Sequence, residues 1–335
     1  MSTIYKRGEY QFQVIVRRKG YPSQTKTFET RREAEEWGRD VESRMYHRQF
    51  RDPREVENTT LAQALQSYLE QVTPHKRGHV TEANRVKLLQ RHPIALRSLA
   101  SLRAKDFAQY RDERLRKVAH NTVRLELALL SHLYTIAIKE WSMPLEHEPK
   151  NIRKPASGSG RDRRLIGDEE TRLFAALLRP EARSSTIWLE ASIRLAIETG
   201  MRAGELLSME WAQVDLMKGV VRLNQTKNGS ARTVPLSLEA VGVLKSLPRD
   251  IMGRVIPNFH DTSGLDRSFK RLVTAAGISN LHFHDLRHEC ATRLAPHMKV
   301  QTLAKIMGWK TLQMAMRYFN PSDDELVQHI RKVAA

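Results

Sequence analysis

Cysteine is almost absent from this 335-residue chain, in which Cys290 stands alone. A single cysteine excludes an intramolecular disulfide and any zinc site built from several cysteines. Long apolar runs are absent as well, since no stretch approaches the roughly 18 apolar residues of a membrane-spanning helix. Residues 1–13 also lack the apolar core of a signal peptide. We therefore expect a soluble, cytoplasmic protein without a membrane partner.

Acidic residues are the minority among the charges. Lysine and arginine number 56 against 38 aspartates and glutamates, so the formal net charge is +18 and the isoelectric point is near 10.2. An excess of this size indicates a polyanionic partner, either nucleic acid or an anionic membrane. The excess is positive over 1–58, 59–150 and 151–335 alike, which favours a protein that surrounds its polyanion. The sequence shows no amphipathic helix with a lysine-rich polar face, so we favour nucleic acid.

The chain length fits two or three modules, and we expect the first at residues 1–56. Apolar and polar residues alternate over 10–16, which predicts a half-buried strand, and 25–28 fits a further strand. A capping box at Thr30–Glu33 then predicts the start of a helix. The expected module is a small sheet backed by one helix. Its basic strand residues fit either a solvated hairpin or a DNA contact, and the charge of the whole chain favours the second.

Residues 57–148 change character and are predicted to be helical throughout. Apolar stripes indicate helices near residues 61–72, 80–91, 102–118 and 120–141. Residues 149–164 contain prolines, a Ser-Gly-Ser-Gly run and several arginines and lysines, which predicts a basic, flexible linker.

The remainder, 165–335, is predicted to be mostly helical with one hairpin. Residues 219–226 and 231–236 look like strands, and the Asn-Gly pair between them is a strong tight-turn signal. With the N-terminal sheet, this makes the expected fold class mainly α with small β elements (α+β).

Four short segments of this last region carry reactive or phosphate-binding side chains. They are Thr199–Leu206 (TGMRAGEL), Lys227 at the expected hairpin tip, His282–His288 (HFHDLRH) and Gly308–Tyr318 (GWKTLQMAMRY). Each of them alone has an ordinary structural explanation, such as a solvated arginine or a tyrosine in the core. The information lies in their order along the chain.

In that order, the segments resemble the catalytic domain of the tyrosine recombinase, or phage integrase, superfamily. That family uses an arginine, a lysine, H-x-x-R, a histidine or tryptophan, and then a tyrosine. The matching positions are filled by Arg202, Lys227, His284, Arg287, Trp309 and Tyr318. The resemblance implies a site-specific DNA recombinase whose nucleophile is Tyr318. Less specifically, it implies an arm-type DNA-binding domain at 1–56, a core-binding domain at 57–148, and a catalytic domain with a C-terminal docking helix at 165–335.

The residue types suit this reaction. A tyrosine oxygen can form a phosphodiester that conserves the energy of the broken bond. Arg202 and Arg287 offer fixed forks of donors for the non-bridging oxygens of the attacked phosphate. Because two arginines neutralise the phosphate, we expect no metal and no other cofactor.

The resemblance also distributes the proton transfers. It gives Lys227 the role of general acid on the 5′-hydroxyl leaving group, and His284 is the candidate general base for the tyrosine hydroxyl. Glu205 and His288 are expected to orient the catalytic side chains without contacting the phosphate themselves. Trp309 stands where most members have a histidine. Its indole N–H can donate to a phosphate oxygen but cannot exchange a proton, so we expect it to position the phosphate.

A zinc site is the competing interpretation of the histidine segment. His282, His284 and His288 have the spacing H-x-H-x-x-x-H, and Cys290 is near in sequence. The chain offers no further matching ligand cluster, and Arg287 between the histidines would repel a cation. We therefore favour the phosphate site.

Three functions fit this sequence. The leading one is the integrase of a mobile element, which cleaves and rejoins strands through a 3′-phosphotyrosine intermediate and a Holliday junction. Segments 121–131, 160–165 and 281–289 also resemble shufflon-type DNA invertases, so an invertase or resolvase is the alternative. A DNA-binding regulator without turnover is the third. The N-terminal sheet favours integration, because simple core-site resolvases usually lack one, and the six intact site residues argue against the regulator.

The resemblance implies partners and a location. The partners are double-stranded DNA, a homotetramer on paired sites, and an excisionase or DNA-bending protein as an accessory. A capping box at Ser322–Glu325 predicts a last helix, and in this family the segment after the tyrosine typically docks on a neighbouring protomer. We expect the protein on DNA in the cytoplasm of a prokaryotic cell, encoded there or by a phage.

Overall fold

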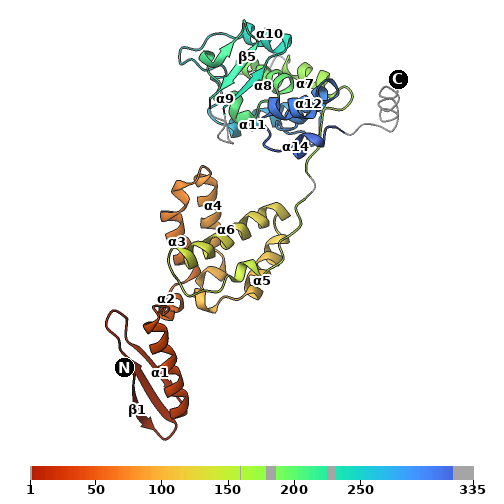
Figure 1. Ribbon diagram of the computed structural model, residues 1–335. Helices are drawn as coiled ribbons and strands as arrows, with labels where there is room; N and C mark the ends of the chain where they lie inside the picture. Colours follow the sequence, from red (N-terminus) through yellow and green to blue (C-terminus); the bar gives the residue numbers. More distant parts are fainter. Residues whose placement is uncertain (1, 159, 179–185, 225–230, 320–335) are drawn as a thin grey trace, which may run out of the picture. The chain divides into compact units, whose positions relative to one another are not determined.

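The computed structural model describes residues 2–158, 160–178, 186–224 and 231–319 (Figure 1). Its contacts divide the chain into two compact units, Met1–Ser159 and Gly160–Ala335, and each is described by itself. Helices dominate both, and each holds one three-stranded antiparallel sheet within the described ranges. The predicted α+β fold class is therefore confirmed. Over the same ranges, no helix combines the length and the apolar character that crossing a membrane requires.

The first unit begins with the sheet β1 (Ser2–Gly8), β2 (Gln11–Val16) and β3 (Gln24–Phe28), in that order. Helix α1 (Arg31–Tyr46) lies along the sheet and contacts all three strands (Figure 1). The predicted capping box is present, because the Glu33 N–H donates to the Thr30 hydroxyl and the Thr30 N–H donates to the Glu33 carboxylate. Strand β1 was not predicted. It is an edge strand with mostly exposed side chains, so no apolar alternation marks it.

Helices make up the rest of this unit. They are α2 (Pro53–Asn58), α3 (Leu61–Gln71), α4 (His79–Gln90), α5 (Ala104–Leu115) and α6 (His120–Lys139). The last four correspond to the predicted helices. Tyr68, Phe107 and Tyr134 are among the large side chains that fill their common core. The short helix α2 was not predicted, and its Val56 packs into this core. The boundary expected after residue 56 therefore runs through a helix that packs with the bundle.

The segment expected to be a flexible linker is anchored at both ends. Ile152 packs into the core of the first unit. The Arg153 carbonyl accepts a hydrogen bond from Arg111 at 2.9 Å, and the Pro155 carbonyl accepts one from Arg124 at 2.6 Å. From residue 161 onward, the side chains bond to the second unit instead. The stretch between these anchors is therefore much shorter than the predicted 149–164.

The second unit surrounds α8, whose buried face is strongly apolar and which packs against α10 and α12. Its helices are α7 (Glu169–Leu177), α8 (Thr186–Thr199), α9 (Ala203–Leu207), α10 (Leu238–Ser246), α11 (Thr262–Ala275), α12 (Asp285–Leu294), α13 (Val300–Met307) and α14 (Leu312–Met316). A second, smaller hydrophobic cluster is formed by buried side chains of α12, α13 and the residue after α12, and Trp309 and Tyr318 pack against it.

The predicted hairpin is present in this unit. Its sheet has the order β4 (Val214–Asp215), β5 (Val220–Leu223) and β6 (Arg232–Pro235), and Val221 pairs with Val234. The expected turn around 228–229, with Lys227, lies outside the described residues. The capping box expected at 322–325 and the helix after it lie outside them too.

Candidate active site

Arg202 lies in a sharp turn between α8 and α9. Gly200 begins this turn with a φ of 61°, a left-handed conformation that favours glycine. Space requires glycine as well, because an added Cβ would lie 2.7 Å from the Met307 side chain. Arg202 then caps α9: its N–H donates to Glu205 Oε2 and its Nη1 donates to Oε1, both at 2.9 Å. The TGMRAGE segment therefore presents one arginine held by one carboxylate.

Glu205 is buried and joins Arg202 to a second arginine. Arg232, on β6, places Nη2 2.6 Å from Glu205 Oε2 and has a side chain only 7% exposed. Burial acts to raise the pKa of Glu205, but the charges of Arg232 and Arg202 and the hydrogen bonds to them hold it below its usual range. Glu205 is therefore ionised and fixes both guanidinium groups.

Arg232 was missed by the sequence analysis, because a lone arginine in a strand matches no motif. A signal for it does exist in the Gly-Trp pair of the last segment. Gly308 has a φ of 64°, and an added Cβ there would lie 2.7 Å from Arg232 Cδ. The Arg232 guanidinium also donates to the Ile306 carbonyl at the end of α13. Glycine at 308 thus leaves the space that the Arg232 side chain occupies.

Arg287 comes from the first turn of α12 and is almost fully buried, with 4% of its surface exposed. Its guanidinium donates to the carbonyls of Gly200 and Met307, so it is held against the turn that carries Arg202. Burial, followed by the charges of Arg202 and Arg232, lowers the pKa of Arg287 to about 9. Guanidinium groups are strong donors to phosphate and carboxylate oxygens, so Arg202 and Arg287 are suited to bind an anion.

Tyr318 follows α14 and lies between Trp309 and His288. The tyrosine and tryptophan rings stack with centroids 5.3 Å apart and planes 6° apart. The hydroxyl is hydrogen-bonded to Nδ1 of His288. The Arg287 guanidinium in turn lies 5.6 Å from the Trp309 ring, so Trp309 links the tyrosine to the arginine site. Burial raises the pKa of Tyr318, and the phenol therefore keeps its proton until a base removes it.

The structure places His288, and not His284, against that hydroxyl. The sequence analysis expected His284 to be the base and His288 to support it. His284 precedes α12, one helical turn before His288, and its ring lies 5.4 Å from the His288 ring. Burial, then the charges of His284 and Arg317, lower the pKa of His288 to about 4. His288 is therefore neutral at pH 7, and its Nδ1 can accept the Tyr318 proton.

Two predictions remain, the general acid Lys227 and the alternative zinc site. Lys227 lies outside the described residues. For the zinc interpretation, the described ranges contain no group of three or more His, Cys, Asp or Glu side chains arranged to hold a metal ion. Burial also raises the pKa of the Cys290 thiol to about 12, which disfavours the thiolate that a metal needs.

Comparison with known proteins identifies the family. Residues 163–325 match the sequence model of the phage integrase family. A shufflon-specific DNA recombinase of Escherichia coli is 39% identical over 273 residues, which cover 78% of this chain and 69% of that protein. The chain belongs to the phage integrase family. The chain is also 34% identical to a putative integrase/recombinase of Haemophilus influenzae over 331 residues, which cover 96% of this chain and 88% of that protein.

Solved structures agree in fold. A lambda integrase dimer bound to a COC′ core site superimposes with a TM-score of 0.66 and 21% identity, covering 95% of this chain and 94% of that one. A lambda integrase tetramer bound to a Holliday junction gives a TM-score of 0.64 and 20% identity, covering 92% and 95%. The family model and the sequence relatives, rather than these structures, confirm the tyrosine site-specific recombinase predicted from motif order.

Proposed function

We propose that this recombinase cleaves DNA by attack of the Tyr318 oxygen on a backbone phosphate. The bond from tyrosine oxygen to phosphorus forms as the bond from phosphorus to the 5′ oxygen breaks, which leaves a 3′-phosphotyrosine and a free 5′-hydroxyl. Attack of another strand's 5′-hydroxyl on that link would form a Holliday junction. The observation that carries the proposal is the Tyr318 hydroxyl on the neutral His288 nitrogen, next to a cluster of fixed arginines.

The arginines are suited to the charge that develops on the phosphate. Arg287 commits one N–H on each Nη atom to the carbonyls of Gly200 and Met307, which fixes its plane and leaves other N–H groups for an oxyanion. Arg202 is fixed in the same way by Glu205. Donors held in place before the reaction stabilise the transition state without reorganising during it.

The contacts around Tyr318 and the motif at Lys227 support the following proton transfers. His288 takes the Tyr318 proton, and His284 packs against the His288 ring and orients it. Trp309 holds the tyrosine ring by stacking and donates its indole N–H to the phosphate. Lys227, which comes from the motif alone, protonates the leaving 5′ oxygen.

We further propose that the substrate is double-stranded DNA, bound by a homotetramer on paired sites. The net charge of +18 supports DNA, and the fold is shared with lambda integrase, which was solved as a dimer on a core site and as a tetramer on a Holliday junction. The helical part from α2 to α6 and the second unit would hold the core site. The sheet with α1 would bind a separate arm site, and an excisionase or DNA-bending protein would set direction.

Integration and excision of a mobile element are the favoured outcome. The sheet with α1 has a core of its own, and the similarity to the Haemophilus influenzae putative integrase/recombinase extends over 96% of the chain. Inversion is the second candidate, because the shufflon-specific recombinase is 39% identical. Sequencing the DNA around the gene after induced expression separates the two. An excised circle with a rejoined chromosome supports integration, and a reversed segment supports inversion.

One experiment tests the chemistry. Duplexes that the wild-type protein selects from a random-sequence library are incubated with it, and covalent complexes are resolved on a denaturing gel. We expect a protein–DNA adduct that survives denaturation and is absent in Tyr318→Phe, which keeps the ring but loses the oxygen. Tyr10→Phe, at a tyrosine 70% exposed on the first unit, is the matched control and should still form the adduct. An adduct that persists in Tyr318→Phe would rule out this nucleophile.

A further inference from the structure

The first residues of the second unit form polar contacts that the proposed reaction does not use. Arg161 forms a bidentate ion pair with Asp285, in which Nε donates to Oδ1 at 2.6 Å and Nη2 donates to Oδ2 at 2.7 Å. Its Nη1 also donates to the Asn280 side-chain oxygen at 3.0 Å. The Asp285 carboxylate has no exposed surface and accepts one more hydrogen bond, from the His282 N–H at 2.7 Å. A buried carboxylate thus depends on an arginine 124 positions away in sequence.

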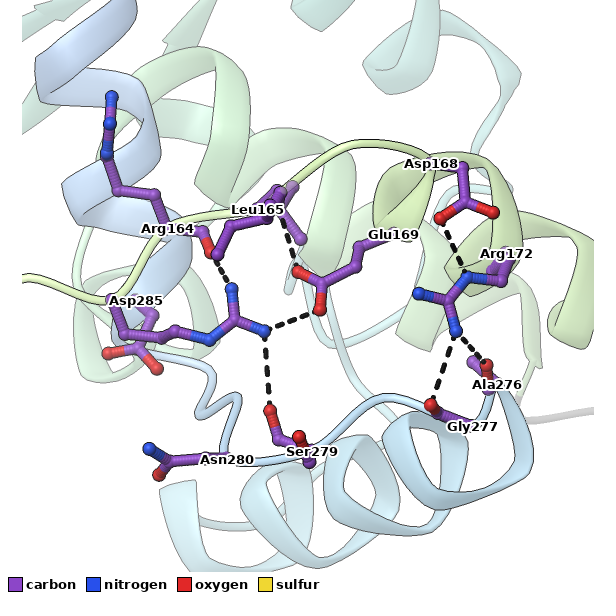
Figure 2. Close-up of polar contacts among 12 residues, drawn as sticks. Arg164, Leu165, Asp168, Glu169, Arg172, Ala276, Gly277, Ser279, Asn280 and Asp285 are labelled. Carbon is purple, nitrogen blue, oxygen red and sulfur yellow. Dashed lines mark hydrogen bonds and ion pairs between the residues drawn. The ribbon is translucent and has the colours of Figure 1, made fainter.

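Neighbouring contacts hold the same stretch of chain in place. Arg163 donates to Glu169 at 2.6 Å and to the Ser279 carbonyl at 3.3 Å. Figure 2 shows Arg172 reaching from α7 to the carbonyls of Ala276 and Gly277, each at 3.2 Å. Side chains from residues 161–172 therefore hydrogen-bond to residues 276–280, in the loop that leads into α12.

Asp285 occupies a sensitive position for the active site. It is the first residue of α12, directly after His284 and within one turn of Arg287 and His288. A fork-to-carboxylate pair fixes both distance and plane. The ion pair between Arg161 and Asp285 is therefore expected to fix the position of the first turn of α12. The directions of the side chains that follow depend on that position.

The main chain at the same residue contacts the tyrosine segment. Arg317 Nη2 donates to the Arg161 carbonyl at 3.0 Å. Arg317 directly precedes Tyr318, and its guanidinium lies 5.6 Å from the tyrosine ring. Gly160 leaves room for this contact, because a Cβ there would lie 3.3 Å from Arg317 Nη1. Arg161 is thus bonded to both segments that supply the His288–Tyr318 pair.

We propose that Arg161 is a positioning residue for DNA cleavage: its side chain fixes the start of α12 and its carbonyl holds Arg317, so that His288 and Tyr318 meet. The inference rests on the proposed roles of His288 and Tyr318. Arg161 touches no reacting atom. Its guanidinium already donates to Asp285 and Asn280, which argues against a contact with DNA. Binding to a DNA phosphate is nevertheless the competing role, and the experiment must distinguish the two.

The experiment compares binding with chemistry in the full-length protein. The probe is a duplex that the wild-type protein selects from a random library, nicked just 3′ of the mapped cleavage position so that the cleaved product is trapped. Anisotropy gives the affinity and its salt dependence, and single-turnover adduct formation gives the cleavage rate. We expect Arg161→Ala to keep wild-type affinity and to cleave about 100-fold more slowly, the scale of a misplacement of about 1 Å in a catalytic site.

Matched variants make the result specific. Arg164→Ala removes the same charge from an exposed neighbouring side chain and should cleave at the wild-type rate. Arg161→Lys keeps the charge without the fork and should be intermediate, and it carries the test if Arg161→Ala does not fold. Asp285→Asn should be slowed like Arg161→Ala, and the double variant no further, because both remove one contact.

Each outcome has a distinct meaning. If Arg161→Ala and Arg161→Lys cleave as fast as the wild type, Arg161 does not position the site. If Arg161→Ala loses affinity and salt dependence while the bound complex cleaves normally, Arg161 is a phosphate contact and the proposal fails. If the wild-type protein itself forms no adduct, the proposed function fails first and the inference fails with it.

Discussion

The Tyr318 hydroxyl lies against Nδ1 of His288, two residues separated by 30 positions in the chain. The partner of the tyrosine is therefore the histidine after H-x-x-R and not the histidine that begins it. This contact supports the proposal that His288 is the base, which the first prediction tests.

Replacing His288 with Phe should slow cleavage by about 10²–10⁴-fold, the usual contribution of a general base. An aromatic ring remains to stack on Tyr318, and the imidazole nitrogens, among them the one bonded to the hydroxyl, are lost. His284→Phe should have the smaller effect, because that ring does not contact the hydroxyl. Single-turnover adduct formation on the selected duplex measures both. A larger loss in His284→Phe would return the role of base to His284.

Stability should fall on acidification, and His288 should contribute to that fall. Burial lowers its pKa from 6.5 to about 4, so between these values the unfolded chain binds a proton that the folded protein excludes. The contribution is fully present above pH 6.5 and is lost as the pH falls toward 4. It is on the order of 2 kcal/mol, from about 1.4 kcal/mol per pKa unit with allowance for solvent. Urea unfolding of wild type and His288→Phe at several pH values measures it, and parallel curves would contradict it.

Glu205→Gln should destabilise the protein by about 3–5 kcal/mol, the usual cost of removing one partner from a buried ion pair. Arg202 and Arg232 would then face each other without their shared carboxylate. Urea unfolding gives the change. Glu210→Gln, at an exposed glutamate nearby in sequence, is the control and should be neutral. If Glu205→Gln is as stable as the wild type, the carboxylate does not hold the arginines in place.

Lys227→Ala should be slowed strongly on normal DNA, and a 5′-phosphorothiolate substrate should restore much of its rate. A sulfur leaving group departs without protonation, so it removes the need for a general acid. Lys218→Ala, at a lysine in the turn before β5, should behave as the wild type on both substrates. Equal slowing of Lys227→Ala on both substrates would move the acid to another residue.

Deletion of residues 1–50 should spare cleavage of an isolated core site but impair recombination of full sites. The sheet and α1 have their own core, whereas α2 packs with the bundle, so the cut must keep Asp52, which caps α2 at the Arg54 N–H. Affinity for full-site DNA should also depend less steeply on salt, because fewer phosphates are neutralised. Full-site recombination by the shortened protein at the intact rate would contradict an arm-binding role.

The amino-acid sequence by itself determined the features whose signals lie within a few residues. The capping box at Thr30–Glu33, the helices from 61 to 139 and the hairpin strands around Val221 and Val234 follow from local periodicity and turn chemistry. The order of the motifs also predicted the family, because that order is a property of the chain alone. The edge strand β1 escaped, since its exposed side chains leave no pattern.

Only the tertiary structure decided which of these residues meet. Arg232 pairs with Glu205 across 27 positions, His288 reaches Tyr318 across 30, and Arg161 grips Asp285 across 124. No local propensity specifies such pairs, because they depend on how α12, β6 and the tyrosine segment pack around one core. The sequence supplied most of the chemical groups of this site but not Arg232. Packing decided that His288 meets the tyrosine, because that contact depends on where the segment carrying Tyr318 lies against α12.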